Sequence, residues 1–269
     1  MIHKRLVILG FLTLLLIFAS FMYFERDKDS IAGSGELLIS QYQGYVAGYV
    51  NDTVRLDIYW IKIGNNNFSG VFGVRNLPSC LSADKITLTE TVYFKNPDIN
   101  ERTISVRLKL KTPGRCGMKD AYLIIQRQNT IKKLHLGSIT FEIYRKPDHP
   151  SLRIPKYIIG SIGSEPSPPM LQYTFYNPFN DSVKILNVVF EVPGLRVLKL
   201  QAPVILPQGE ANLTIITENT TKMGRLYIIR PMIIYKAGSR RYSMPAEAFY
   251  YATIPDEKKL SSVLTGEEG

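Results

Sequence analysis

The sequence predicts an all-β protein in which one N-terminal transmembrane helix is followed by two antiparallel β-sandwich domains. Three observations support this fold class. The run from Leu6 to Phe24 is a long, uncharged apolar segment. From Glu36 onward, apolar and polar residues alternate with period two, which is the pattern of a half-buried strand. A break bracketed by prolines at residues 146–150 then divides the strand patterns into two halves, each near the size of one sandwich domain.

The apolar segment, residues 6–24, is predicted to cross a membrane. Nineteen helical residues span about 28 Å, close to the thickness of the hydrocarbon core of a bilayer. The short head before it, residues 1–5, carries Lys4 and Arg5, whereas the residues after it have mixed charge. Because positive residues stay on the cytoplasmic side, we expect a cytoplasmic N-terminus and an extracytoplasmic remainder at the cell membrane.

A cleaved signal peptide is the alternative interpretation of the same segment. Its apolar core is typically shorter, about 7–15 residues. Cleavage after Ser20 would place Phe18 at the third position before the cut, where a small residue is preferred. The uncleaved signal anchor is therefore favoured, with residues 25–36 as a flexible spacer. Both interpretations export the rest of the chain.

The first predicted domain spans residues 37–146 and is built from alternating strand patterns. The break at residues 146–150 contains two prolines, and a strand does not continue through such a segment. The second predicted domain spans residues 154–255. Its predicted core residues are Leu171, Tyr173, Phe175, Leu186, Val188, Phe190, Val192, Leu213, Ile215, Ile228 and Ile233. The remaining residues, 256–269, form a polar tail that we expect to be frayed.

A short internal repeat supports the two-domain division. The sequence FKNP at residues 94–97 recurs as FYNP at residues 175–178, and each copy ends an alternating strand. Asn-Pro starts a turn, because the residue before proline is disfavoured in a helix and Asn can bond its own backbone.

These residues carry a family resemblance. The second domain, with FYNP, the strand VVFEV at 188–192 and the turn and strand PQGEANLT at 207–214, resembles exported immunoglobulin-like β-sandwich modules. The fibronectin type III and CARDB-like adhesion modules are the nearest kinds. The first domain matches only at TVYFKN, residues 91–96. The resemblance implies two immunoglobulin-like domains with a general binding or spacing role, and it assigns no catalytic residue.

The chain contains two cysteines, Cys80 and Cys116. An even pair in an exported domain predicts a disulfide. The bridge would close a ring of about 37 residues and stabilise the fold by about 3–4 kcal/mol. Two buried free thiols are the alternative.

Five N-glycosylation sequons agree with export and make this a candidate glycoprotein. Their asparagines are Asn51, Asn67, Asn180, Asn212 and Asn219.

The formal net charge of +10 suggests anionic partners such as lipid head groups or acidic polysaccharide. A soluble surface with a scattered basic bias explains the same number. Export argues against nucleic acid, and no recognition module for it is present. The predicted partners are the bilayer, through residues 6–24, and a protein or anionic component of the cell surface.

No catalytic, metal-binding or cofactor-binding site is predicted. His3, His135 and His149 have no ligand spacing, and no nucleophile elbow or phosphate-binding glycine loop occurs. The acids lie in turns or at solvent-facing strand positions, which indicates solvated charge. The sixteen tyrosines suit ordinary sheet positions or a binding face.

The sequence therefore favours a membrane-anchored, extracytoplasmic, non-enzymatic binding or scaffold protein of the cell surface. An accessory subunit of a membrane complex, whose outer domain caps a partner, is the alternative. An exported hydrolase is a third and weaker interpretation.

Overall fold

A computed structural model describes residues 35–63, 70–89, 92–93, 98–127, 130–221 and 224–265, and this part of the chain is almost entirely β-structure. The prediction of an all-β chain is confirmed for these residues. The predicted head (1–5) and anchor (6–24) lie outside them, as does most of the spacer; Glu36 already belongs to the first strand. Among the described residues, no helix has the length and apolar character needed to cross a membrane.

The N-terminal body is formed by two antiparallel sheets that pack on one hydrophobic core, together with part of a third sheet. Alternation produces this core as expected: Val54, Leu56, Ile58 and Trp60 are all buried on one face of their strand. The first sheet has the order β1 (Glu36–Ile39), β3 (Thr53–Ile63), β7 (Ile99–Leu110), β5 (Leu81–Leu88), with β6 (Val92–Tyr93) beside β7. The second has the order β10 (Thr130–His135), β9 (Tyr122–Arg127), β4 (Val71–Arg75).

The C-terminal body packs two further antiparallel sheets on a second core. Leu171, Tyr173 and Phe175 point into this core from one strand, as the alternation predicts. One sheet has the order β12 (Arg153–Tyr157), β14 (Met170–Tyr176), β17 (Glu210–Asn219), β16 (Leu195–Gln201). The other has the order β15 (Val183–Val189), β19 (Met232–Ala237), β20 (Arg240–Pro245).

A six-stranded sheet, here called the junction sheet, joins the two bodies. Its strands come from both halves of the chain. Their order is β13 (Gly160–Gly163), β21 (Phe249–Thr253), β18 (Leu226–Arg230), β2 (Tyr42–Tyr49), β11 (Gly137–Tyr144), β8 (Gly114–Met118). Strands β2 and β18, which are far apart in sequence, pair in parallel at the centre of the sheet.

Both faces of the junction sheet are buried at its centre, in β2 and β18, because successive side chains of a strand point to opposite faces and a core packs on each face. Val46 and Ile228 belong to the first core, whereas their neighbours Tyr45, Ala47 and Ile229 belong to the second. The predicted segments 37–146 and 154–255 therefore share a sheet, and their cores meet across it. The boundaries stay a prediction, but the structure does not support two sandwiches that each close without the other.

The C-terminal residues are ordered where a polar tail was expected, so that prediction is wrong for most of residues 256–269. Residues Glu257–Thr265 form a helix, α2, that places Leu260 and Leu264 in the first core. Asp256 caps the helix: its Oδ1 atom accepts a hydrogen bond of 2.9 Å from the amide of Lys259.

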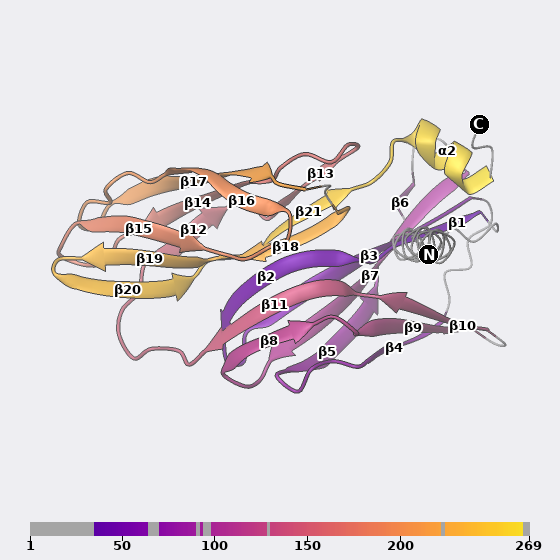
Figure 1. Ribbon diagram of the computed structural model, residues 1–269, viewed down its shortest axis with the longest axis horizontal. Coiled ribbons are helices and arrows are strands. Elements are labelled where there is room, and N and C mark those ends of the chain that lie inside the picture. The colour runs from indigo at the N-terminus through magenta and orange to yellow at the C-terminus, as the bar shows by residue number, and fades with distance from the viewer. Residues whose placement is uncertain are drawn as a thin grey trace, which may run out of the picture.

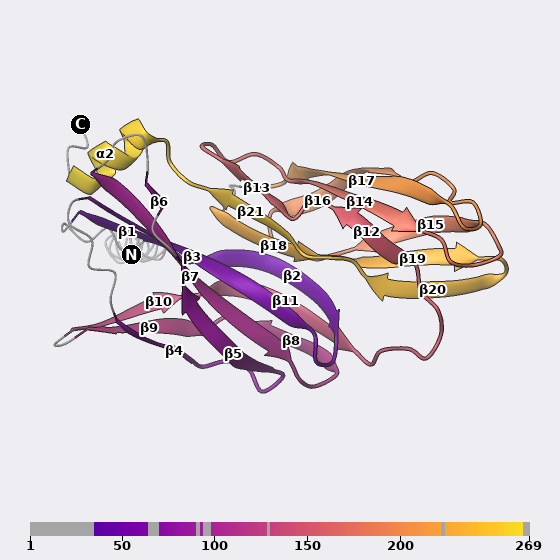
Figure 2. The same cartoon turned by 180° about the vertical axis from the view of Figure 1, so that it is seen from behind.

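The molecule is elongated, with the two bodies end to end (Figures 1 and 2). Strand β1 and helix α2 lie at one end. The hairpin of β19 and β20 lies at the opposite end, which we call the distal end.

Candidate functional site

Cys80 and Cys116 form a disulfide, which confirms the predicted pairing and rules out free thiols. The bond links the start of β5 in the first sheet to β8 in the junction sheet. It closes one side of the N-terminal core, where Cys80 is buried. Its contribution is structural.

Four of the predicted glycosylation sites have exposed side chains, and the fifth, Asn67, lies outside the described residues. Asn51 occupies the turn between β2 and β3, and Asn180 follows the turn that starts at Asn177. Asn212 and Asn219 lie in β17. Modification of these residues stays a prediction.

The histidines and acidic residues are the groups of the described part of the chain that could bind a metal. No group of three His, Cys, Asp or Glu side chains there could hold a metal ion. His135 in β10 and His149 in the segment between the bodies are exposed, and His3 is outside the described residues.

A hollow of about 460 Å³ opens where the segment between the bodies passes the sheet of β15, β19 and β20, here called the distal sheet. We call it the linker hollow. Its walls come from the ends of β2 and β11, from the connecting segment, and from β19 and β20. The residues that line it are Tyr49, Tyr144, Arg145, Pro147, His149, Met232, Ile234, Arg241, Tyr242 and Ser243.

Hydrogen bonds fix the tyrosine side of the linker hollow. The hydroxyl groups of Tyr144 and Tyr45 both donate to Oε2 of Glu142, at 2.7 and 2.8 Å. Partial burial and the bond to Glu142 raise the pKa of Tyr144 to about 12, so this phenol stays neutral. Arg115 balances the carboxylate at 3.5 Å and also pairs with Glu191 of the C-terminal body.

Aromatic contacts fix the opposite side. The ring of His149 meets Tyr242 edge-on, with 5.0 Å between centroids. Tyr242 in turn stacks on Tyr235 and Phe179 at 5.5 and 5.6 Å. The connecting segment is therefore held against β20, and the hollow has defined walls.

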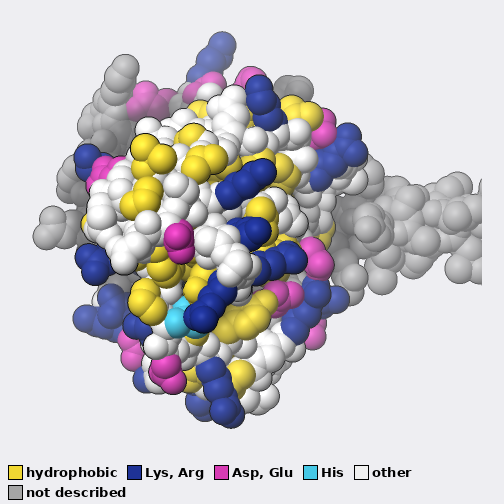
Figure 3. All heavy atoms as spheres, turned by 90° about the vertical axis from the view of Figure 1, so that its left-hand side faces the viewer, with side chains coloured by type: hydrophobic (Ala, Val, Ile, Leu, Met, Phe, Trp, Pro, Cys, Tyr) yellow, Lys and Arg dark blue, Asp and Glu magenta, His cyan; other side chains and the backbone are white. Residues whose placement is uncertain are grey.

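Three basic residues form a row across the outer face of the distal sheet. Lys184 lies directly opposite Lys236, and Lys236 lies directly opposite Arg241, which also lines the hollow. All three are exposed, and none forms an ion pair with another described residue. Like charges at directly opposite positions destabilise a sheet. On the face that looks along the long axis, Lys and Arg side chains gather beside apolar ones (Figure 3).

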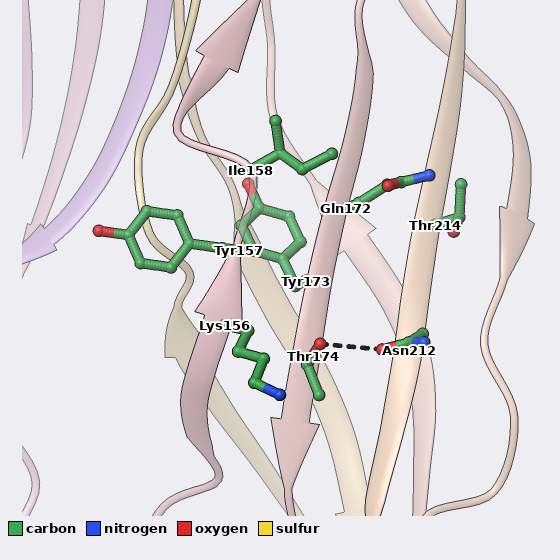
Figure 4. A pocket seen from close by; sticks show the side chains of 8 residues that line it. All are labelled: Lys156, Tyr157, Ile158, Gln172, Tyr173, Thr174, Asn212 and Thr214. Atoms are coloured by element: carbon green, nitrogen blue, oxygen red, sulfur yellow. Dashed lines mark hydrogen bonds between the residues drawn. The ribbon is translucent and has the colours of Figure 1, made fainter.

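A second hollow, of about 330 Å³, lies on the sheet formed by β12, β14 and β17. Neutral polar groups dominate it: Gln172 and Thr174 lie opposite Thr214 and Asn212, and the Thr174 hydroxyl donates to Oδ1 of Asn212 at 2.9 Å. In Figure 4 the ring of Tyr157 extends away from this polar pair. Because Asn212 and Thr214 belong to one sequon, a glycan on Asn212 would begin inside this hollow.

An apolar edge adjoins the second hollow. Strands β12 and β13 are each the outermost described strand of their sheet, and the segment that joins them exposes apolar side chains. Ile159 is 59% exposed, and Ile162 in β13 is 67% exposed. Tyr157 at the end of β12, Ile158 after it and Met170 at the start of β14 are exposed as well.

No family model and no curated protein matches this chain. Among solved structures, a protein of unknown function from Porphyromonas gingivalis W83 is 12% identical, with 81% of this chain and 99% of that chain covered and a TM-score of 0.28. Tandem Ig repeats of Dlar give 11% identity, coverage of 82% and 98%, and a TM-score of 0.22. Zebrafish RET cadherin-like domains 1 to 4 are 7% identical, with 82% of this chain and 51% of that chain covered and a TM-score of 0.28. Such TM-scores identify no family.

The basic row and the linker hollow were not predicted from the sequence. Alternation along each strand places Lys184, Lys236 and Arg241 toward solvent, and these solvent-facing positions can be predicted from the sequence. Their alignment depends on the cross-strand register, which no local pattern specifies. The break at residues 146–150 did mark one wall of the hollow.

Proposed function

We propose that this chain is a membrane-anchored, extracytoplasmic, non-enzymatic binding or scaffold protein, with its N-terminus in the cytoplasm. The single observation that carries this proposal is the placement of the basic row at the distal end, opposite β1 (Figure 1). The predicted anchor precedes β1 by a short spacer. A chain held through residues 6–24 would thus present the basic row farthest from the bilayer.

Contacts between the bodies support a scaffold role, because they hold the distal end in a fixed position. Arg230 of β18 pairs with Asp52 of the N-terminal body at 2.8 Å, and its Nε donates to the carbonyl of Ala246. Arg115 and Glu191 form a second ion pair between the bodies. The junction sheet adds continuous backbone pairing. A disulfide also agrees with an oxidising compartment.

The orientation can be tested by labelling intact cells that express the Ser239→Cys variant. Ser239 is exposed in the hairpin between β19 and β20, and both native cysteines are bridged, so the new thiol is the reactive one. We expect a membrane-impermeant maleimide to label this variant in intact cells, and the labelled chain to sediment with membranes. Wild-type protein is the control and should stay unlabelled. Labelling only after cell lysis would contradict the proposal.

The accessory-subunit alternative is favoured by one observation, the apolar edge around Ile159 and Ile162. Exposed apolar surface beside an unpaired strand edge is typical of protein interfaces. The two functions differ in an observable way. A subunit extracted in mild detergent would migrate with a fixed membrane partner, whereas the binding protein would migrate alone.

A further inference from the structure

We propose that the linker hollow and the basic row together bind an acidic polysaccharide, with sugar rings in the hollow and carboxylate groups along the row. This deepens the proposed function and depends on it only in placing the site outside the cytoplasm.

The charge arrangement is the first argument. Neighbouring strands lie about 4.8 Å apart, so Lys184, Lys236 and Arg241 place three positive charges along roughly 10 Å of the sheet face. Arg145 adds a fourth charge on the opposite wall of the hollow, and no described acid pairs with any of them. This spacing fits a ligand that repeats its negative charge along a chain. Bound anions would also remove the repulsion within the row.

The lining of the hollow is the second argument. Arg145 and Arg241 can each hold a carboxylate with two parallel hydrogen bonds. Ser243 offers a hydroxyl group, and the Tyr144 oxygen can accept a hydrogen bond while its proton is donated to Glu142. Burial together with the charge of Asp52 raises the pKa of Tyr49, which keeps that phenol neutral. Met232 and Ile234 supply an apolar floor. Charged, hydroxyl and apolar groups in one recess suit a sugar ring, which has both polar edges and apolar faces.

The position of the site favours a polysaccharide over a lipid surface. The row lies at the distal end, away from β1 and therefore away from the predicted anchor. The hollow is also a recess. Exposed Asp148 lies between two of its lining residues, Pro147 and His149, and the carboxylate of exposed Asp181 lies beside Gly238 in the hairpin turn between β19 and β20. A flat anionic membrane would meet these acids as well as the row, whereas a single polymer chain can follow the basic residues.

The test measures binding of the full chain, in a mild non-ionic detergent, to immobilised polygalacturonate, with uncharged dextran as the blank. The variant Lys184→Gln/Lys236→Gln/Arg241→Gln removes the row. The matched control, Lys85→Gln/Lys111→Gln/Lys119→Gln, removes the same charge from exposed positions of the N-terminal body. We expect the first variant to bind at least about tenfold more weakly, because several charge-assisted contacts are lost. We expect the control to stay within about twofold and wild-type binding to weaken with salt.

Several results would overturn the proposal. Equal losses in both variants would mean that net charge alone drives binding. Binding to vesicles of an anionic phospholipid, without binding to polygalacturonate, would assign the row to a membrane. Absence of binding to either probe would reject the site. Thermal unfolding provides the folding check, since removing like charges should leave the midpoint unchanged or raise it. Export is tested separately by Ser239→Cys, so failure of one proposal does not imply failure of the other.

Discussion

At the scale of single residues, the most unusual group is Glu36, a buried carboxylate at the start of β1. The indole Nε1 of Trp60 donates to Oε1 of Glu36, and Lys132 pairs with Oε2. Lys62 lies 3.6 Å from Oε1 and 4.7 Å from the centre of the Trp60 ring. Burial alone would raise the pKa of Glu36, but the bond and charge of Lys132, with help from Trp60 and Lys62, hold the pKa below its usual value of 4.5.

This arrangement predicts a pH-dependent contribution to stability. A carboxylate with a lowered pKa in the folded state stabilises the fold above its unfolded pKa, and the contribution is lost as the pH falls through the folded pKa. We expect Glu36→Gln to cost about 1–3 kcal/mol at neutral pH, because it weakens charge-assisted hydrogen bonds to a buried group. The difference from wild type should shrink below pH 4.5. Urea unfolding followed by Trp60 fluorescence measures the free energy of unfolding of wild type and variant at each pH. Glu210→Gln, at an exposed position, is the control. A difference that stays constant with pH would contradict this assignment.

Individual residues also show what the sequence could predict. Asn177 was predicted to start a turn, and its Oδ1 accepts from the amide of Phe179 at 2.9 Å. Its Nδ2 donates to the carbonyls of Asp181, Ile205 and Leu206, contacts that only the tertiary structure supplies. The first copy of this motif, residues 94–97, lies outside the described residues.

Leu186 was predicted to be a core residue and is 41% exposed. A bulge between Ile185 and Asn187 shifts the register against β19, so that Ile185 is buried instead. Strict alternation cannot reveal a bulge, because one extra residue reverses the parity of the strand without changing its composition.

At the scale of elements, the contact between β2 and β18 joins the two halves of the chain. It depends on Gly44, which lies opposite Ile228. A Cβ atom at position 44 would lie 2.5 Å from the backbone oxygen of Ile228 and equally close to its Cγ2 atom. Glycine is therefore required here by close approach of two backbones.

Gly44→Ala should accordingly destabilise the protein by about 1–3 kcal/mol, since the backbone of β18 must move to admit the methyl group. Hydrogen exchange of the β18 amides should increase more than exchange in the distal sheet. Gly73→Ala is the matched control, because a Cβ atom there has no neighbour within 4 Å. Its effect should stay within about 0.5 kcal/mol. Equal effects of the two variants would show that β2 and β18 tolerate separation.

Helix α2 shows why the C-terminal prediction was wrong. The composition of residues 256–269 is polar, but Leu260 and Leu264 lie four positions apart on one helical face. Asp256 supplies an N-cap at the right spacing, which is a readable signal for a helix start. A single helix of nine residues is marginal alone, and packing on the first core stabilises it.

At the scale of the whole molecule, the alternation of apolar residues predicted the all-β class and the buried face of several strands. Ile228, predicted for the second core, is buried in the first. Alternation could not predict that β18 returns to pair with β2, because these contacts join residues about 180 positions apart. One signal was present in the sequence: Tyr45, Val46 and Ala47 form an uninterrupted apolar run in β2, which suits a strand covered on both faces, and all three are buried. The two bodies therefore form parts of one structure through the junction sheet.

This continuity makes a prediction about cooperativity. Removing the disulfide with Cys80→Ala/Cys116→Ala should destabilise the N-terminal body by about 3–4 kcal/mol, because the bond spans 36 positions. If that body unfolds, Tyr45, Ala47 and the other residues of the junction sheet that face the second core lose their support. We therefore expect the C-terminal body to unfold at the same, lowered midpoint.

Two reporters distinguish the bodies in one urea titration of the full chain in mild detergent. Trp60, the chain's single tryptophan, is fully buried in the first core, so its fluorescence follows the N-terminal body. Hydrogen exchange of peptides from β14 and β17 follows the C-terminal body. Coincident shifts of both midpoints in the cysteine-free variant would establish one cooperative unit. A shift in Trp60 fluorescence alone would instead make residues 37–146 and 154–255 autonomous domains, because the second core would then survive without the first.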